Sequence, residues 1–478
     1  MTARCVMVLG TTSGAGKSWL ATALCRWYAR RGLRVALFKA QNMSNNARVA
    51  DGGEIGSAQW FQALAAGATP DVRMNPLLLK PESDTSSQAV VLGRVDEDLS
   101  RRPWQGRSLS VWPQVAAALD DLRARHDVVV LEGAGSPAET NLKDGDIANM
   151  RSAAHADARC LLVCDIDRGG AFAHLYGTWA LLEDHERARI RGFVLNKFRG
   201  DASLLAPAPR DLQRLTGIPT VAVLPMWHGH GLPEEDGLPL LSPPRGDGAP
   251  RVRIAVVAYP RISNHDEFQP LAGLSGVELR WARTPAGLER ADWIVLPGSK
   301  HTSSDLAWLR AQGLDRAIAA HARRGGRVLG ICGGLQMLGE ALVDPHGIDG
   351  NGPGLGLLPL VTLFEPGKAV RRTEAVFGAV QGAWSALAGV PVRGYEIHHG
   401  RTQQHPAMAP GHEAMPGLAW QDATGNVLGV YLHGLFEDPR VLRALFAVDA
   451  PSLDAVFDRM ADFIDRHVAP GVLEDLIA

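Results

Sequence analysis

Runs of consecutive apolar residues recur along the chain and alternate with segments of helical character. Short apolar runs bounded by turn residues are typical of buried strands. The predicted strands span residues 4–10, 33–38, 127–132, 159–165, 190–196 and 220–224 in the first half, and 252–258, 292–296, 326–331 and 428–432 in the second. Strands that alternate with helices predict an α/β protein with doubly wound, largely parallel sheets.

A segment rich in chain breakers divides the sequence near its middle. Its prolines are Pro233, Pro239, Pro243, Pro244 and Pro250, and its glycines are Gly237, Gly246 and Gly248. Such a density of proline and glycine is typical of an interdomain linker. We therefore expect a first domain over residues 1–232, a linker over 233–250 and a second domain over 251–478.

Composition narrows the class of protein. The chain has 478 residues and a formal net charge of only −2, so no bulk electrostatic attraction to nucleic acid or anionic membranes is expected. No uninterrupted apolar run approaches the ~20 residues of a membrane span, and no signal peptide is recognised at the N-terminus. The five cysteines are too scattered for a disulfide framework. These features favour a protein of the reducing cytoplasm.

The first predicted strand leads into a glycine-rich loop of the kind that binds nucleotide phosphates. In such a loop, backbone N–H groups hold the phosphates, the lysine reaches the β- and γ-oxygens, and the serine ligates Mg²⁺. The predicted ATP-binding residues of the loop are Gly10, Thr11, Gly14, Gly16, Lys17 and Ser18. The loop is one residue longer than usual, and in this it resembles the dethiobiotin synthetase branch of phosphate-loop proteins. A chance glycine-rich turn is the alternative.

The carboxylate on the metal side of such a loop should stand at the end of another strand. Glu132 leaves an apolar strand for a glycine-rich segment, where it could meet Mg²⁺ directly or through water, together with Ser18. Asp51 is a further metal candidate. Lys39 is a candidate for neutralising a phosphate or a substrate carboxylate, and Asn196 for contacting the adenine base. For Glu132 and Lys39, an ordinary solvated side chain at a strand end is the alternative.

A cysteine between glycines stands out in the second half. The apolar strand 326–331 runs into Cys332, two glycines and a helix, which is the G-x-nucleophile-x-G elbow with cysteine in place of serine. The helix N-terminus favours an ionised thiol there. His433, which ends the apolar run 428–432, is the expected base, because a cysteine enzyme needs a base nearby in space. A buried structural cysteine and a structural histidine are the alternatives.

Blocks of sequence along nearly the whole chain carry a family resemblance. They comprise residues 38–46, 79–85, 146–150, 165–170, 194–201, 296–300, 330–334, 393–398 and 431–434. In type and order they resemble the cobyric acid synthase family, the glutamine-dependent amidotransferases of cobalamin biosynthesis. The Lys-Ala-Gln-Asn-Met-Ser-Asn-Asn block at 39–46 separates the chain from the cobyrinic acid a,c-diamide synthases, which are similar in architecture but lack it.

The resemblance implies a dethiobiotin-synthetase-like P-loop domain followed by a class I glutamine amidotransferase domain. The first would use ATP and Mg²⁺ to phosphorylate a side-chain carboxylate of a corrinoid. The second would release ammonia from glutamine, and the ammonia would displace phosphate to give an amide. In this family adenosylcobyrinic acid a,c-diamide is amidated at its b, d, e and g carboxylates, which yields adenosylcobyric acid. The chemistry is consistent, since a carboxylate needs a leaving group before it forms an amide in water.

The resemblance also assigns roles within the glutaminase site. Cys332 would attack the glutamine carboxamide to form a thioester, and His433 would carry the proton to the departing ammonia. The expected oxyanion donors are backbone N–H groups of Gly298, Ser299 and Gly333. Many class I amidotransferases place a glutamate two residues after the histidine, but Leu435 occupies that position. The sequence leaves open whether Glu437, a distant group or no third residue orients His433.

For several polar residues the sequence predicts a role less specifically. Lys80 and Arg168 are candidates for contacting the substrate, with structural ion pairs as the alternative. His228 and His230 form an H-x-H pair that we interpret as non-metal, because a zinc site needs three or four ligands. The cobalt would arrive within the corrinoid, so no permanently bound metal is expected. Oligomerisation is compatible with the sequence.

Two other functions compete with this interpretation. One is a sibling amidotransferase for another polycarboxylate, such as an a,c-diamide synthase or a cell-wall glutamate amidase. The other is a phosphate-loop switch or partitioning ATPase with an inactive amidotransferase-like domain. The second predicts ATP hydrolysis that is uncoupled from glutamine and indifferent to Cys332→Ala, and the intact elbow with its matching histidine argues against it.

Overall fold

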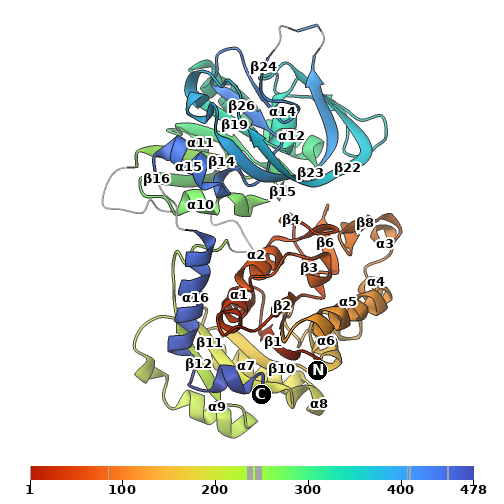
Figure 1. Ribbon diagram of the computed structural model, residues 1–478, viewed down its shortest axis with the longest axis vertical. Helices are drawn as coiled ribbons and strands as arrows, with labels where there is room; N and C mark the ends of the chain where they lie inside the picture. Colours follow the sequence, from red (N-terminus) through yellow and green to blue (C-terminus); the bar gives the residue numbers. More distant parts are fainter. Residues whose placement is uncertain are drawn as a thin grey trace.

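Two largely parallel sheets, one in each half of the chain, form the cores of two stacked lobes (Figure 1). The computed structural model describes residues 2–83, 85–233, 241–242, 250–405, 407–408, 411–448 and 452–478. Each of the strands predicted from the apolar runs is present, with ends that differ by at most a few residues. The predicted α/β class is confirmed.

The first sheet has the order β12-β11-β10-β1-β9-β2 and is parallel throughout. Its strands are β1 (Arg4–Gly10), β2 (Val35–Phe38), β9 (Val128–Glu132), β10 (Arg159–Asp165), β11 (Ile190–Phe198) and β12 (Thr220–Pro225). Strand β1 lies between β9 and β10, so the chain goes from β1 to the edge strand β2, returns to β9 and then continues to β10, β11 and β12 on the other side. In such sheets ligands bind beyond the carboxyl ends of the strands at this switch point. The loop after β1 occupies that place.

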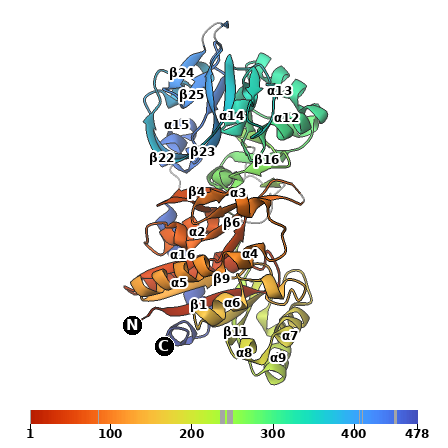
Figure 2. The same cartoon turned by 90° about the vertical axis from the view of Figure 1, so that its right-hand side faces the viewer.

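Helices cover the first sheet, and two smaller sheets lie on its side toward the second lobe (Figures 1 and 2). The helices are α1 (Lys17–Ala29), α2 (Ser57–Ala65), α3 (Glu97–Arg101), α4 (Arg107–Ser110), α5 (Trp112–Arg125), α6 (Met150–His155), α7 (Ala171–Leu181), α8 (Asp184–Arg187) and α9 (Ala208–Thr216). The smaller sheets consist of β3 (Gln41–Met43), β6 (Leu77–Pro81), β7 (Ser87–Val91) and β8 (Arg94–Asp96), and of the hairpin β4 (Ala47–Ala50) and β5 (Gly53–Gly56).

The second sheet has the order β13-β16-β14-β17-β19-β26-β25-β24, with a parallel centre and antiparallel edges. Its strands are β13 (Leu241–Ser242), β14 (Val252–Val257), β16 (Val277–Ala282), β17 (Trp293–Leu296), β19 (Arg327–Ile331), β24 (His412–Met415), β25 (Ala419–Gln421) and β26 (Val427–Val430). The helices of this lobe are α10 (Gln269–Ala272), α11 (Pro285–Leu288), α12 (Thr302–Ala311), α13 (Leu314–Arg323), α14 (Gly333–Leu338) and α15 (Pro439–Phe446). No helix within the described ranges is long and apolar enough to cross a membrane.

A long hairpin in the second lobe has no counterpart among the predicted strands. Strands β22 (Leu360–Val376) and β23 (Pro391–Gln404) pair along most of their length, with β20 (Ala341–Val343) and β21 (Gly352–Pro353) at one edge. The outer part of β22 is mostly exposed, so its sequence lacks an apolar pattern. A short ladder joins β15 (Ile262–Ser263) to β18 (Gly298–Ser299).

The C-terminal helices return to the first lobe, although the sequence-based boundaries assign residues 251–478 to the second domain. Helix α16 (Leu453–His467) packs beside α1, and α17 (Val472–Asp475) follows it (Figure 1). Phe457 and Ile464 belong to the hydrophobic core of the first lobe. The indole of Trp27 donates a hydrogen bond of 2.7 Å to Asp465. The first domain is therefore completed by the end of the chain.

The predicted linker lies mostly outside the described residues. Residues 234–240 and 243–249 fall in this category. Between them, Leu241–Ser242 form β13, which pairs antiparallel with β16 at the edge of the second sheet. At least this part of the 233–250 segment belongs to the second lobe.

The return of α16 generates a stability prediction. Phe457 is 1% exposed in the core of the first lobe. We expect Phe457→Ala to lower the free energy of unfolding of that lobe by about 3 kcal/mol, because it leaves a cavity between α16 and its neighbours. Urea denaturation measures the change. Arg459→Ala, at an exposed position on the same helix, should change it by less than about 0.5 kcal/mol. Equal effects of the two substitutions would contradict the assignment.

Candidate active sites

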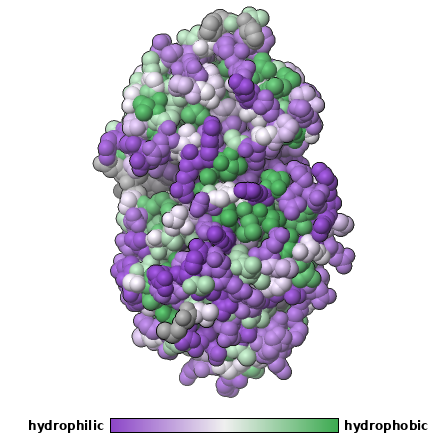
Figure 3. All heavy atoms as spheres, turned by 45° about the vertical axis from the view of Figure 1, so that its right-hand side comes forward, coloured by the Kyte–Doolittle hydropathy of each residue, from purple (hydrophilic) through white to green (hydrophobic). Residues whose placement is uncertain are grey.

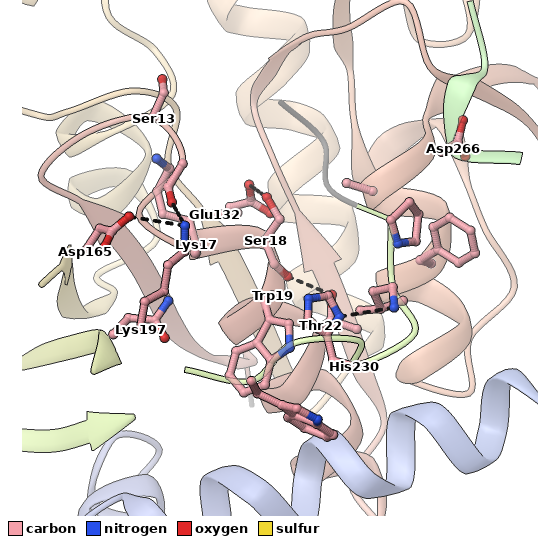
Figure 4. Close-up of a pocket in the computed structure, with 18 of the residues that line it drawn as sticks. Ser13, Lys17, Ser18, Trp19, Thr22, Glu132, Asp165, Lys197, His230 and Asp266 are labelled. Carbon is pink, nitrogen blue, oxygen red and sulfur yellow. Dashed lines mark hydrogen bonds and ion pairs between the residues drawn. The ribbon is translucent and has the colours of Figure 1, made fainter. Parts of the chain in front are cut away.

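The glycine-rich loop joins the end of β1 to the start of α1 in the first lobe (Figure 4). Gly16 precedes the helix with a φ of 100°, a left-handed conformation that favours glycine. The Lys17 side chain folds back over the loop, and its Nζ donates hydrogen bonds of 3.0 Å to the carbonyls of Thr12 and Gly135. A Cβ on Gly10 would lie 2.9 Å from the Cδ of Lys17, so the lysine passes directly over that glycine. The strand–loop–helix context of a phosphate loop is thus present.

Glu132 is the centre of a buried polar cluster beside the loop. Its Oε1 accepts hydrogen bonds from Ser18 Oγ at 2.7 Å and from Lys39 Nζ at 2.8 Å, and its Oε2 accepts one from Gln62 at 2.6 Å. A hydroxyl and a carboxylate side by side are ligands that Mg²⁺ prefers, so the pair fits the expected metal position. Lys39 is engaged with Glu132. Asp51 is not part of the cluster, because it lies exposed in the β4–β5 turn.

A cavity of about 670 Å³ opens over the loop. Lys17, Ser18, Lys39, Glu132, Asn196 and Arg168 are among its lining residues. Asn196 donates a hydrogen bond of 2.9 Å to the Ala15 carbonyl, which places its amide against the loop. Arg168 lies over Gly14, since a Cβ on that glycine would be 3.6 Å from its guanidinium. Asp266 of the second lobe also lines the cavity, so the two lobes meet at its wall.

The far wall of this cavity is aromatic. Trp19, Trp227 and Phe463 pack against one another there, with His230 edge-on to both tryptophans. His230 is thus part of a packed aromatic group, in edge-to-face contact with its neighbours. In the described parts of the chain, no three His, Cys, Asp or Glu side chains converge as a metal site would require. The H-x-H pair therefore lines the nucleotide cavity.

Lys80 does not line the cavity, contrary to the expectation of a substrate contact. It is 4% exposed, and its Nζ lies 2.8 Å from Glu54 Oε2. Lys368 of β22 bonds the other oxygen of Glu54. Burial lowers the pKa of Lys80 to about 8 against the attraction of Glu54. The structural ion pair, left open by the sequence, is what forms within the first lobe, and the Lys368–Glu54 pair beside it joins the two lobes.

The nucleophile elbow of the second lobe has the strained geometry that its sequence predicts. Cys332 caps α14 with φ 50° and ψ −106°, a conformation that non-glycine residues rarely adopt. Its backbone N–H bonds the Val430 carbonyl of β26 at 2.8 Å. A Cβ on Gly334 would lie 1.9 Å from the Leu296 carbonyl oxygen, so only glycine fits there. The turn therefore presents the thiol at the carboxyl edge of the sheet.

His433 follows the neighbouring strand β26 and is held by Glu267. Its Nδ1 lies 2.9 Å from Glu267 Oε1, and the backbone N–H of Gly434 donates to Oε2 at 2.9 Å. Both side chains of the pair are at most 1% exposed. Gly298 packs against the ring, since a Cβ there would be 2.7 Å from His433 Cε1. With Nδ1–H directed to Glu267, the other ring nitrogen is available to Cys332.

The charges around His433 favour its protonated form. Burial by itself would lower the pKa of His433, but Glu267 and Cys332 outweigh burial and raise the pKa to about 10. The same two groups also form hydrogen bonds to the ring. An imidazolium beside the sulfur would stabilise negative charge there, which suits nucleophilic attack by Cys332.

Backbone donors for an oxyanion converge beside the elbow. A Cβ on Gly333 would lie 2.8 Å from the backbone nitrogen of Ser299, so these two residues are in close contact. The hydrogen bond from Lys300 N to the Arg261 carbonyl leaves Ser299 at the non-hydrogen-bonded position of the β15–β18 ladder. Its N–H therefore points away from β15. The Ser299 hydroxyl donates to Asp305 at 2.6 Å, which fixes the turn.

Glu267 is the residue that sequence reasoning missed. It lies in the 3₁₀ turn η4 (His265–Phe268), 166 positions from His433, and sequence spacing says nothing of such a contact. Glu437, the acid considered from the sequence, instead bonds Arg48 of the first lobe at 2.6 Å. The available signal was the adjacent acidic pair Asp266 and Glu267 in the mostly polar segment 264–269 after β15, and that pattern alone does not identify a partner.

The matches to known protein families divide the chain in the same way as the two lobes. A family model of the CobQ/CobB/MinD/ParA nucleotide binding domain matches residues 6–237, and one of the CobB/CobQ-like glutamine amidotransferase domain matches residues 253–441. A cobyric acid synthase of Variovorax paradoxus (strain S110) is 73% identical over 480 residues, with 100% of both chains covered. The chain belongs to the cobyric acid synthase family. A relative of that name from Acidovorax sp. (strain JS42) is 71% identical and covers 100% of this chain and 98% of its own.

Membership of the cobyric acid synthase family confirms the class of enzyme expected from the sequence. The chain is a glutamine-hydrolysing ligase with a nucleotide-binding P-loop domain and an amidotransferase domain. The amidotransferase match ends at residue 441, before α16, in agreement with the return of that helix to the first lobe.

The Glu267–His433 pair generates a prediction about the thiol. We expect Glu267→Gln to reduce glutamine hydrolysis about 100-fold or more, because the imidazole loses its orienting carboxylate. Loss of that charge should also lower the pKa of His433. The imidazolium that stabilises the thiolate would then lose its proton at a lower pH than in the parent enzyme. The rate of Cys332 alkylation by iodoacetamide, followed by peptide mass spectrometry, should therefore shift to higher pH.

The matched control for this prediction is Glu413→Gln, at an exposed position on β24 of the same lobe. It should leave both the glutaminase rate and the alkylation profile unchanged. An alkylation profile of Glu267→Gln that matches this control would refute the role of the carboxylate.

Proposed function

We propose that this enzyme amidates the b, d, e and g carboxylates of adenosylcobyrinic acid a,c-diamide with ATP and glutamine and releases adenosylcobyric acid. The observation that carries the proposal is the placement of two complementary sites. A phosphate-loop cavity and a Cys332–His433–Glu267 constellation lie on either side of the segment 264–267, and Asp266 of that segment lines the cavity. The family to which the chain belongs carries out this conversion.

The first half of the reaction activates the carboxylate. Lys17 would neutralise the β- and γ-oxygens of ATP as the γ-phosphoryl group moves to the corrinoid carboxylate, giving an acyl phosphate and ADP. Ser18 and Glu132 would hold Mg²⁺, which supplies charge stabilisation on the phosphates. The aromatic wall of the cavity and Asn196, against the loop, offer contacts for the base.

The second half generates ammonia. Cys332 would attack the glutamine carboxamide, and His433 would protonate the departing nitrogen, leaving a glutamyl thioester that water hydrolyses to glutamate. The backbone N–H groups of Gly333 and Ser299 would bind the developing oxyanion. Ammonia then attacks the acyl phosphate, the C–O bond to phosphate breaks, and an amide and inorganic phosphate leave.

The corrinoid itself needs an open, partly apolar surface, because the macrocycle is wide and its edge carries carboxylates. Hydrophobic side chains gather at the waist of the molecule, where the two lobes meet (Figure 3). Met43 is 45% exposed and lines the cavity, and the Arg168 side chain is 68% exposed at the same opening. An apolar contact beside an exposed guanidinium suits such a polycarboxylate. We place the reaction in the cytoplasm.

Mass spectrometry of the corrinoid provides the first test. The enzyme is incubated with adenosylcobyrinic acid a,c-diamide, Mg-ATP and glutamine, and the products are followed in time. We expect a ladder of masses that ends after four added amides, with ATP consumed at each step. An unchanged corrinoid, alongside intact glutaminase or ATPase activity, would keep the ligase class but reject this substrate in favour of another polycarboxylate.

Two substitutions test the division of labour between the lobes. Cys332→Ser should abolish amidation driven by glutamine and leave amidation driven by ammonium within about twofold, because only the nitrogen source is lost. Lys17→Ala should remove amidation from both nitrogen sources, since the carboxylate is no longer activated. Loss of ammonium-driven amidation in a folded Cys332→Ser enzyme, or a fully active Lys17→Ala enzyme, would contradict the assignment.

A further inference from the structure

The segment that carries Glu267 is bonded to the first lobe as well as to its own. Asn264 donates a hydrogen bond of 2.6 Å to the Ala47 carbonyl, and Asn46 contacts the His265 ring at 2.8 Å. Ala47 begins β4, which lies at the top of the lower lobe, beneath β15 and β23 (Figure 1). The turn that orients the glutaminase histidine therefore sits on the ATP-binding domain.

Arg48 is the charged centre of this contact. It is 1% exposed, although it belongs to β4 of the ATP-binding domain. Its guanidinium bonds Asp266 and lies 2.6 Å from Glu437, both of the amidotransferase domain. Its Nε donates to Ser57 Oγ at 3.1 Å, and that hydroxyl donates to Asp266 at 2.5 Å. One arginine thus bridges two acidic residues of the other lobe.

Each of the two acids is close in the chain to a residue of the His433 site. Asp266 immediately precedes Glu267, which bonds His433 Nδ1. Glu437 ends the 3₁₀ turn η6 (Leu435–Glu437), whose preceding residue Gly434 donates to the other oxygen of Glu267. A change in the position of either acid would therefore move the histidine or its carboxylate partner.

A ring stack links Arg48 to the histidine by a second route. The guanidinium carbon of Arg48 lies 5.0 Å from the centre of the Tyr395 ring. The same ring stacks on His433, with ring centres 5.4 Å apart and an interplanar angle of 20°. The backbones of Tyr395 and His433 also exchange two hydrogen bonds, of 2.9 and 3.2 Å. The imidazole plane is thus packed on a tyrosine that Arg48 contacts.

Electrostatics make Arg48 hard to replace. Asp266 and Arg48 are nearly fully buried, and a buried charge that loses its partner is strongly unfavourable. Burial would raise the pKa of Asp266, but the charge of Arg48 lowers it below its usual range. Without the guanidinium, the two acids would lose the cation that bridges them and would repel each other.

We infer that Arg48, a residue of the ATP-binding domain, is a positioning residue of the glutaminase site. It fixes the two turns that carry Glu267 and the residues after His433, so efficient glutamine hydrolysis requires the docked ATP-binding domain. The inference rests on the proposed glutaminase role of Cys332 and His433. It adds that the site is completed only across the domain boundary.

The test compares Arg48→Met with Lys368→Met in the full-length enzyme. Lys368→Met removes a different ion pair between the lobes, and Glu54 keeps Lys80 as a partner. We expect Arg48→Met to reduce the kcat of glutamine hydrolysis about 100-fold, the size that misplacement of a catalytic group produces. The KM for glutamine should change by less than about threefold, and so should the rate of amidation driven by ammonium. Lys368→Met should stay within about twofold of the parent in every parameter.

A second variant, Arg48→Lys, separates positioning from folding. It keeps the charge but lacks the planar fork that reaches two acids, so its glutaminase kcat should lie between those of Arg48→Met and the parent. It also serves if Arg48→Met fails to fold, as judged by thermal unfolding. In that case a kcat of Arg48→Lys at least about tenfold below the parent, with ammonium-driven amidation retained, supports the inference.

Three results would overturn the inference. Glutaminase parameters of the Arg48 variants equal to those of Lys368→Met would show that the contact does not position the histidine. Parallel loss of ammonium-driven and glutamine-driven amidation in a folded variant would indicate a general structural role. A rise in KM without a fall in kcat would place Arg48 in glutamine binding. A parent enzyme without glutaminase activity would instead refute the proposed function, which keeps the two failures distinct.

Discussion

Buried charge at the junction of the lobes is the constraint on which the arrangement of both active sites depends. Arg48 reaches from the first lobe to the second, where it bonds the buried Asp266 and the partly exposed Glu437. Because a buried ion is strongly unfavourable without its partners, this contact favours the docked arrangement of the lobes. That arrangement also sets the turn that carries Glu267, and through it the orientation of His433. The contact that docks the two lobes is thus also the contact that holds the segment carrying Glu267.

The two candidate sites occupy equivalent places in their sheets. Each site lies at the carboxyl edge of a parallel sheet, after β1 and β9 in the first lobe and after β19 and β26 in the second. At these edges, loops can carry reactive side chains while the strands beneath remain fully apolar. The edges face each other across the segment 264–267, whose Asp266 borders the nucleotide cavity.

Prediction from sequence succeeded where the signal is local. The strand runs, the phosphate loop and the cysteine elbow each depend on neighbours within about ten residues, so their patterns identify them. Prediction from sequence failed where a feature depends on residues far apart in the chain. The outer part of β22 is exposed and carries no apolar pattern, and α16 resembles any amphipathic helix whether it packs on one lobe or the other. Lys80, a candidate for substrate binding, proved to pair with Glu54 in the interface.

The sequence by itself determined the α/β class, the order of the two domains, the phosphate loop with Lys17 and Ser18, and the cysteine elbow at Cys332. These follow from short-range sterics and from the period of apolar residues. Only the tertiary structure decided which acid orients His433, which lobe holds the end of the chain and which cation neutralises the interface. Such pairings depend on chain segments far apart in sequence, and burial and charge select among them only when the lobes are assembled.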